Sequence, residues 1–186
     1  MPSVLRKRIV SSTVPDAIRV AGVLHDSITD GPGLRFTLFV QGCGKRCPGC
    51  HNPQALPMEG GREFFAEELI ALIRKNPLLT GVTFSGGEPL LQAVSLLPLA
   101  KMVREDGLDL AIYTGLTFEE IMEEADPDML ALLACADILV DGPFVMETRR
   151  LSLRFRGSEN QRILDVPESL AAQKAVWTVV RDWTGS

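Results

Sequence analysis

Short apolar runs alternate with helix-like segments along most of this chain, and this alternation limits the fold more than any other feature of the sequence. Phe65, Leu69, Leu72 and Ile73 have the spacing of one buried helical face, in a segment that ends at Asn76. Neighbouring parallel strands are joined by helical crossovers, so the alternation predicts an α/β protein with a parallel sheet. The expected strands are residues 17–23, 35–41, 82–84, 108–113, 137–141 and 162–166, and the other expected helices are residues 96–106, 117–125 and 126–135.

Two local signals define the ends of these helices. Pro98 is tolerable only in the first turn of a helix, so the second helix is expected to begin near Leu96. Thr117 is followed three residues later by Glu120, which is the pattern of a capping box at a helix N-terminus.

The length of the chain limits how far such a sheet can close. A complete eight-unit β/α barrel needs roughly 250 residues, and this chain has 186. We therefore expect an open-sided, incomplete parallel β/α barrel of the TIM type. The expected barrel domain is residues 17–166, between an N-terminal extension at residues 1–16 and a C-terminal tail at residues 167–186.

Composition excludes several other classes of protein. The residues are 46% hydrophobic and 23% charged, which is enough apolar material for a folded core. The formal charge of −5 argues against a nucleic-acid partner. No apolar stretch reaches the roughly 20 residues of a membrane span. Arg6, Lys7 and Arg8 are not followed by the apolar segment of a secretory signal. We expect a cytoplasmic protein without a membrane partner.

Three of the four cysteines lie in one loop, residues 42–52, which we call the cysteine loop. Cys43, Cys47 and Cys50 have C-x3-C-x2-C spacing, and in a reducing compartment such a cluster indicates metal binding. A structural zinc site needs four ligands, whereas a 4Fe-4S cluster held by three cysteines leaves one iron open to a small ligand. The alternative is a zinc knuckle that also uses His51, but neighbouring side chains on an extended segment point to opposite sides. Cys135 lies in an apolar run and is expected in the core.

A second motif, Ser85-Gly86-Gly87-Glu88-Pro89, follows the next expected strand. Its glycines let the backbone approach a ligand closely, and its carbonyls and the Glu88 carboxylate offer acceptors for an ammonium group. Taken alone, this segment could be an ordinary turn. Its position one strand after the cysteine loop favours a binding site at the carboxyl end of the sheet.

The two motifs in this order resemble the radical S-adenosylmethionine superfamily. Residues 29–36, 41–43 and 50–52 are similar to the activases of glycyl radical enzymes in particular. Residues 113–115, 139–145 and 156–161 are similar to the anaerobic ribonucleoside-triphosphate reductase activating proteins. The resemblance covers residues 20–165. It departs from the family pattern at Phe155, where a tryptophan is usual, and at Gly49, where many members have an aromatic residue.

The resemblance implies two cofactors and their sites. A 4Fe-4S cluster would be held by Cys43, Cys47 and Cys50, and S-adenosylmethionine would contact six residues: Ser85, Gly86, Gly87, Glu88, Asn52 and Tyr113. Because cofactors of this kind carry the chemistry themselves, no general base or nucleophile is required.

The resemblance also implies the partners. The reaction would generate a glycyl radical on a partner enzyme, with the large subunit of anaerobic ribonucleotide reductase as the first candidate and a flavodoxin or ferredoxin as the electron donor. The alternatives are activation of a pyruvate formate-lyase type of enzyme, radical chemistry on a small molecule, and a non-catalytic metal-binding module. Residues 144–166 are expected to form a rim that grips the partner through polar residues such as Asn160 and Gln161, or else to cover the bottom of the barrel.

Overall fold

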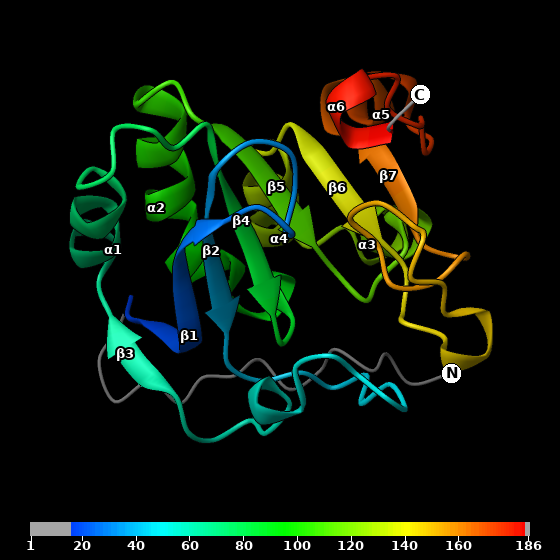
Figure 1. Cartoon of the computed structure of the whole chain (residues 1–186), viewed down its shortest axis with the longest axis horizontal. Coiled ribbons are helices and arrows are strands. Elements are labelled where there is room, and N and C mark those ends of the chain that lie inside the picture. The colour runs from blue at the N-terminus through cyan, green and yellow to red at the C-terminus, as the bar shows by residue number, and fades with distance from the viewer. Residues whose placement is uncertain (1–15, 185–186) are drawn as a thin grey trace.

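The computed structural model describes residues 16–184, which form one mixed sheet with helices packed against it (Figure 1). Of the expected N-terminal extension, residues 1–15 lie outside the described residues. The strand order is β3-β1-β2-β4-β5-β6-β7. The strands are β1 (Ile18–Ser27), β2 (Arg35–Val40), β3 (Arg62–Phe64), β4 (Gly81–Gly86), β5 (Asp109–Tyr113), β6 (Ile138–Asp141) and β7 (Arg162–Asp165).

The centre of the sheet is parallel, as predicted, because β2, β4, β5 and β6 pair in parallel. The expectation of a parallel sheet is wrong at both edges. Strand β1 is antiparallel to β2 and to β3, and β7 is antiparallel to β6. The cause is the connections: the turn at residues 30–33 has no helix that could cross the sheet, so β1 and β2 form a hairpin.

The helices α1 (Ala66–Ile73), α2 (Ala93–Glu105), α3 (Phe118–Glu124) and α4 (Pro127–Leu133) connect the parallel strands and pack in the main core on one face of the sheet. The helices α5 (Val166–Ala172) and α6 (Arg181–Thr184) follow the last strand. Short 3₁₀ turns lie at Pro53–Ala55, Pro89–Gln92 and Met146–Thr148. The predicted capping box of α3 is confirmed: Thr117 accepts from the backbone N–H of Glu120, whose carboxylate accepts from the N–H of Thr117. The strand β3 and the helices α5 and α6 were not predicted.

Helix α2 begins at Ala93, three residues before the expected start, and Pro98 is therefore inside it. The expectation that Pro98 lies in the first turn is wrong. A 3₁₀ turn at Pro89–Gln92 leads directly into this helix and supplies its first turn. Pro98 and Val94 both lie on the exposed face, where water can satisfy the Val94 carbonyl that a proline leaves without a donor.

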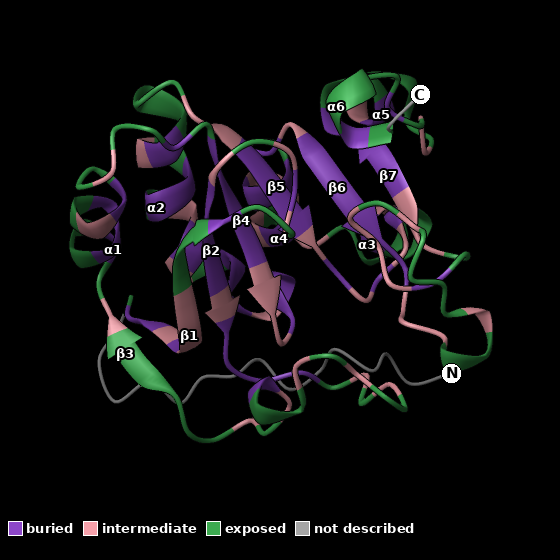
Figure 2. Ribbon diagram, viewed as in Figure 1, coloured by how far each residue is buried: buried purple, intermediate pink, exposed green. Residues whose placement is uncertain are grey.

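The two faces of the sheet bury different clusters. Figure 2 shows the buried residues concentrated along the central strands. Alternate residues such as Phe84, Ile112 and Leu139 pack against the helices in the main core. The opposite face carries a smaller cluster of Ala111, Ile138, Val140, Ile163 and Trp183. Trp183 lies in the expected C-terminal tail and is 2% exposed, so the end of the described chain completes this face. Among the described helices, none is long and apolar enough to cross a membrane.

Candidate functional site

A cavity of about 520 Å³ lies at the carboxyl ends of the parallel strands. Phe39 of β2, Ser85 and Gly86 of β4 and Tyr113 of β5 form its floor, and the cysteine loop forms one wall. In Figure 1 the arrows of β2, β4, β5 and β6 all point toward the edge along which the cyan cysteine loop runs. This is the end of a parallel sheet where α/β proteins bind ligands, and the volume suits a small-molecule site.

Cys43, Cys47 and Cys50 all line this cavity and none forms a disulfide. The base of the loop is anchored to the turn that follows it: the N–H of Gly42 donates to the Ala55 carbonyl (2.8 Å), and the N–H of Cys43 donates to the Leu56 carbonyl (3.1 Å). Burial raises the pKa of the Cys43 thiol, so this thiolate needs a compensating cation.

Two buried glutamines also hold the cysteine loop and the turn after it in position. The Gln41 amide donates to the carbonyls of Gln54 (3.2 Å) and Pro57 (2.7 Å), and the Gln92 amide donates to the Gln41 carbonyl (2.9 Å). Both side chains are buried. The cysteine loop is therefore positioned by hydrogen bonds of the protein itself.

The donor set fits a cluster better than a single ion. Among residues 16–184, no three side chains of His, Cys, Asp or Glu are grouped closely enough to hold one metal ion. His51 instead packs on the Phe144 ring, with ring centroids 4.8 Å apart. A zinc knuckle requires its ligands to converge on one ion, whereas a 4Fe-4S cluster takes each thiolate on a different iron.

Ser85, Gly86 and Gly87 line the cavity beside the cysteine loop. Gly86 has a φ of 100° and a Cβ there would lie 2.5 Å from the Val40 nitrogen, so only glycine fits this end of β4. A Cβ on Gly87 would clash with the Gly42 carbonyl oxygen. These glycines therefore bring β4 and the cysteine loop together, in addition to opening the backbone toward a ligand.

Glu88 is not part of the cavity wall. Its side chain is buried, and its carboxylate accepts from the Thr114 hydroxyl (2.8 Å), the Gly115 N–H (2.8 Å) and the Leu90 N–H (3.2 Å). Burial raises the pKa of the Glu88 carboxyl. The structure thus places Glu88 between the ends of β4 and β5, where its acceptors are used by the chain itself.

Asn52 and Tyr113, the other two predicted ligand contacts, both line the cavity. Tyr113 is the single tyrosine of the chain. Its hydroxyl donates to the Phe155 carbonyl (2.7 Å), and burial raises the pKa of this phenol. Tyr113 therefore stays protonated and connects the cavity floor to the opposite wall.

That opposite wall comes from the segment after β6, and the sequence located it only as a rim. Residues 149–157, which we call the arginine loop, contribute most of it, together with Phe144. The polar residues expected to grip a partner are used within the segment instead. The Asn160 amide donates to the Pro143 carbonyl (2.8 Å), and the Gln161 side chain accepts from the Gly157 N–H (2.8 Å) and donates to the Gly142 carbonyl (3.1 Å).

A three-thiol loop above a glycine-rich strand end defines an iron–sulfur protein with room for a small ligand beside the cluster. Residues 29–164 match the family model described as a 4Fe-4S single cluster domain. The chain belongs to this family and, within it, to the radical S-adenosylmethionine activases of glycyl radical enzymes.

Individual relatives have the following similarity. The chain is 41% identical over 133 residues to the pyruvate formate-lyase-activating enzyme of Clostridium pasteurianum, covering 67% of this chain and 55% of that protein. It is 35% identical over 144 residues to the anaerobic ribonucleoside-triphosphate reductase-activating protein of Vibrio cholerae, covering 73% of this chain and 90% of that protein. The crystal structure of QueE from Escherichia coli aligns over 56% of this chain with a TM-score of 0.45 and 16% identity.

Proposed function

We propose that this protein cleaves S-adenosylmethionine reductively and generates a glycyl radical on an anaerobic ribonucleoside-triphosphate reductase. The observation that carries the proposal is the meeting of Cys43, Cys47 and Cys50 with the glycine-rich end of β4 in one cavity. In this proposal the sheet is an incomplete β/α barrel whose open side admits a protein segment.

Cys43, Cys47 and Cys50 would each supply a thiolate to a different iron of a 4Fe-4S cluster and leave one iron open for the methionyl group of S-adenosylmethionine. With both cofactors bound and one electron delivered by an external reductant, the reduced cluster would supply the electron that cleaves S-adenosylmethionine and allows a hydrogen atom to be taken from a glycine Cα.

The other residues orient the cofactor and keep it in place. The backbone of Ser85, Gly86 and Gly87 offers carbonyl acceptors to the methionyl ammonium, and Asn52 and Tyr113 contact the remainder of the molecule. Glu88 acts indirectly, because it holds Thr114 and Gly115 in position at the end of β5. An electron donor of the flavodoxin or ferredoxin type would reach the cluster through the thin, exposed outer side of the cysteine loop.

The choice of partner rests on the third motif. The matched region covers 90% of the Vibrio reductase-activating protein and 55% of the Clostridium enzyme. At the end of β5 it has Tyr113-Thr114-Gly115, which resembles the reductase activators. Pyruvate formate-lyase is the second candidate, favoured by the 41% identity to the Clostridium enzyme.

The test is electron paramagnetic resonance of the partner. Anaerobically reconstituted protein is mixed with S-adenosylmethionine, dithionite and either an anaerobic ribonucleoside-triphosphate reductase or a pyruvate formate-lyase. We expect a glycyl radical doublet on the reductase and a much weaker one on the lyase. A strong doublet on the lyase alone would reverse the choice of partner.

A further inference from the structure

We propose that the arginine loop, residues 149–157, is the surface on which the protein substrate docks, through an acidic segment beside its target glycine. This inference rests on the proposed function. It commits to a partner chemistry that neither the family nor the names of the relatives specify.

The loop concentrates positive charge at the mouth of the cavity. Arg149, Arg150, Arg154 and Arg156 lie in this one loop of a chain whose formal charge is −5. Arg149, Arg150 and Arg156 line the cavity together with Lys45, and the single acidic side chain that lines it is Asp30. An acidic protein would be repelled by most of this molecule and attracted to this face.

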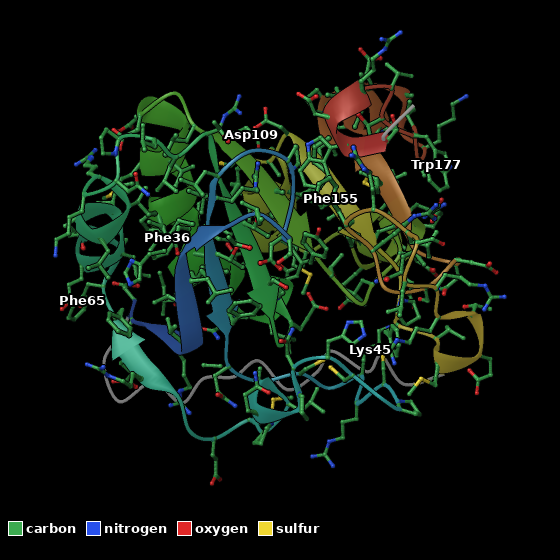
Figure 3. The ribbon with its side chains drawn as sticks, in the orientation of Figure 1. Phe36, Lys45, Phe65, Asp109, Phe155 and Trp177 are labelled. Atoms are coloured by element: carbon green, nitrogen blue, oxygen red, sulfur yellow. The ribbon has the colours of Figure 1, made fainter. Side chains whose placement is uncertain are left out.

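The four guanidinium groups differ in their hydrogen bonds and ion pairs. Arg150 pairs with Glu159 (3.1 Å). Arg156 donates to the Gln161 carbonyl (2.6 Å) and stacks on Trp177, which lies beside β7 in Figure 3. Arg149 and Arg154 are exposed, and their side chains have no hydrogen bond or ion pair with the rest of residues 16–184. These two are free to take carboxylates, for which the planar guanidinium is suited.

The loop also presents an apolar side chain. Leu151 is 89% exposed and lines the cavity together with Arg149 and Arg150. A large exposed apolar residue beside charged groups at the entrance of a cavity favours a contact with a protein over a site for a small molecule alone. S-adenosylmethionine has one carboxylate and cannot use all of these cations.

The loop is anchored at Phe155, which lowers the ordering entropy that docking would cost at this point. Phe155 has a left-handed backbone with φ 52°. Its carbonyl accepts from the Tyr113 hydroxyl, and its ring packs edge-on against Trp183 with centroids 5.3 Å apart. A residue with this backbone conformation persists only where its surroundings fix it, so this end of the loop is positioned before a partner arrives.

The experiment compares two single variants with the same change in charge. The test variant is Arg154→Glu, because Arg154 is exposed and does not line the cavity. The control is Lys174→Glu, an exposed lysine outside the cavity wall. With dithionite as reductant, both should produce 5′-deoxyadenosine without partner at the wild-type rate. The test variant should need about tenfold more reductase for half-maximal glycyl radical, and added salt should affect it less than the wild type.

Each other outcome has a distinct meaning. Unchanged half-saturation in the test variant, or an equal shift in the control, would overturn the docking proposal and leave the proposed function intact. A loss of partner-independent cleavage in Arg154→Glu would assign this arginine to S-adenosylmethionine and overturn the proposal as well. A defect seen only with a protein electron donor would assign the surface to that donor. If the wild type forms no glycyl radical, the proposed function fails, and this inference fails with it.

Discussion

Gly87 shows how the ligand site and the cysteine loop depend on each other at the scale of one residue. A Cβ at position 87 would clash with the Gly42 carbonyl and lie 2.9 Å from the Ala55 carbonyl oxygen. Gly42 is the residue before Cys43, and its N–H donates to the Ala55 carbonyl, so both contacts lie at the anchored base of the cysteine loop.

We therefore predict that Gly87→Val loses most of its iron as well as its affinity for S-adenosylmethionine. The measurement is iron and sulfide per chain after anaerobic reconstitution. Gly22→Ala is the control, since a Cβ at Gly22 meets nothing within 4 Å. A full cluster in Gly87→Val would show that the cysteine loop can shift to accept the side chain.

Glu88 yields a second prediction at this scale. In Glu88→Gln the amide NH₂ would face a hydrogen-bond donor, Thr114 or Gly115, and a buried donor left without an acceptor costs about 1–3 kcal/mol. We expect a normal cluster spectrum and S-adenosylmethionine affinity lowered by about tenfold, measured by calorimetry on reconstituted protein. Unchanged affinity, equal to that of the exposed-site control Glu147→Gln, would remove Glu88 from the positioning of this site.

The site residues that could be identified from the sequence are those that lie close together in the chain. The cysteine loop and the Ser85 to Glu88 motif each lie within a few positions, so their chemistry is visible without a fold. The arginine loop and Trp183 were missed as wall and core residues because their positions depend on packing between distant segments. The hydrogen bonds that Glu88 accepts from Thr114 and Gly115 were not predicted for the same reason, since these donors follow the next strand.

At the scale of elements, the helix α6 supports the cavity wall through Trp183. This side chain packs against Phe155 and lies 5.4 Å from the Arg35 guanidinium. We predict that Trp183→Ala lowers the free energy of unfolding by about 3–5 kcal/mol, measured in denaturant, and reduces glycyl radical yield. Trp183→Phe should recover most of both. Loss of stability with a wild-type radical yield would show that α6 does not act on the arginine loop.

The ion pair between α3 and β7 gives a prediction for pH. Hydrogen bonds from Arg162 hold the pKa of the Glu119 carboxyl below its ordinary value. The carboxylate therefore stabilises the fold above the ordinary pKa, and this contribution is lost as pH falls through the lowered pKa. We expect Glu119→Gln to lower the free energy of unfolding by about 0.5 kcal/mol near neutral pH and by nothing in acid. A difference that persists in acid would point to a cause other than charge.

The hydrophobic periodicity predicted the helices and strands in the middle of the chain. It did not predict how the strands at the edges of the sheet pair. Strand β3 is short and has two exposed residues, so it has no apolar pattern. The antiparallel direction of β1 and β7 depends on the path of the connecting loops, which propensity does not encode. The start of α2 lies three residues before the predicted one, because the 3₁₀ turn at Pro89–Gln92 leads directly into the helix and Pro98 does not mark its first turn.

At the scale of the whole molecule, the two walls of the cavity differ in composition: one carries the cysteines and the other carries arginines. The cysteine loop lies along one side with Lys45 on it, and the arginine loop lies along the other with Phe155 directed toward the sheet (Figure 3). The cysteine loop and the arginine loop thus line the same cavity, together with residues of β4 and β5. In the proposed function this arrangement would bring a radical formed beside the cysteine loop to a glycine docked at the arginine loop.

The most direct test of this account is reductive cleavage of S-adenosylmethionine by the isolated protein. After anaerobic reconstitution and reduction with dithionite, we predict 5′-deoxyadenosine and methionine in equal amounts. Cys43→Ala, Cys47→Ala and Cys50→Ala should each lose the cluster and the products, while Cys135→Ala should keep both, because its thiol packs beside the main core. A wild-type protein that binds and reduces its cluster but leaves S-adenosylmethionine intact would contradict the account.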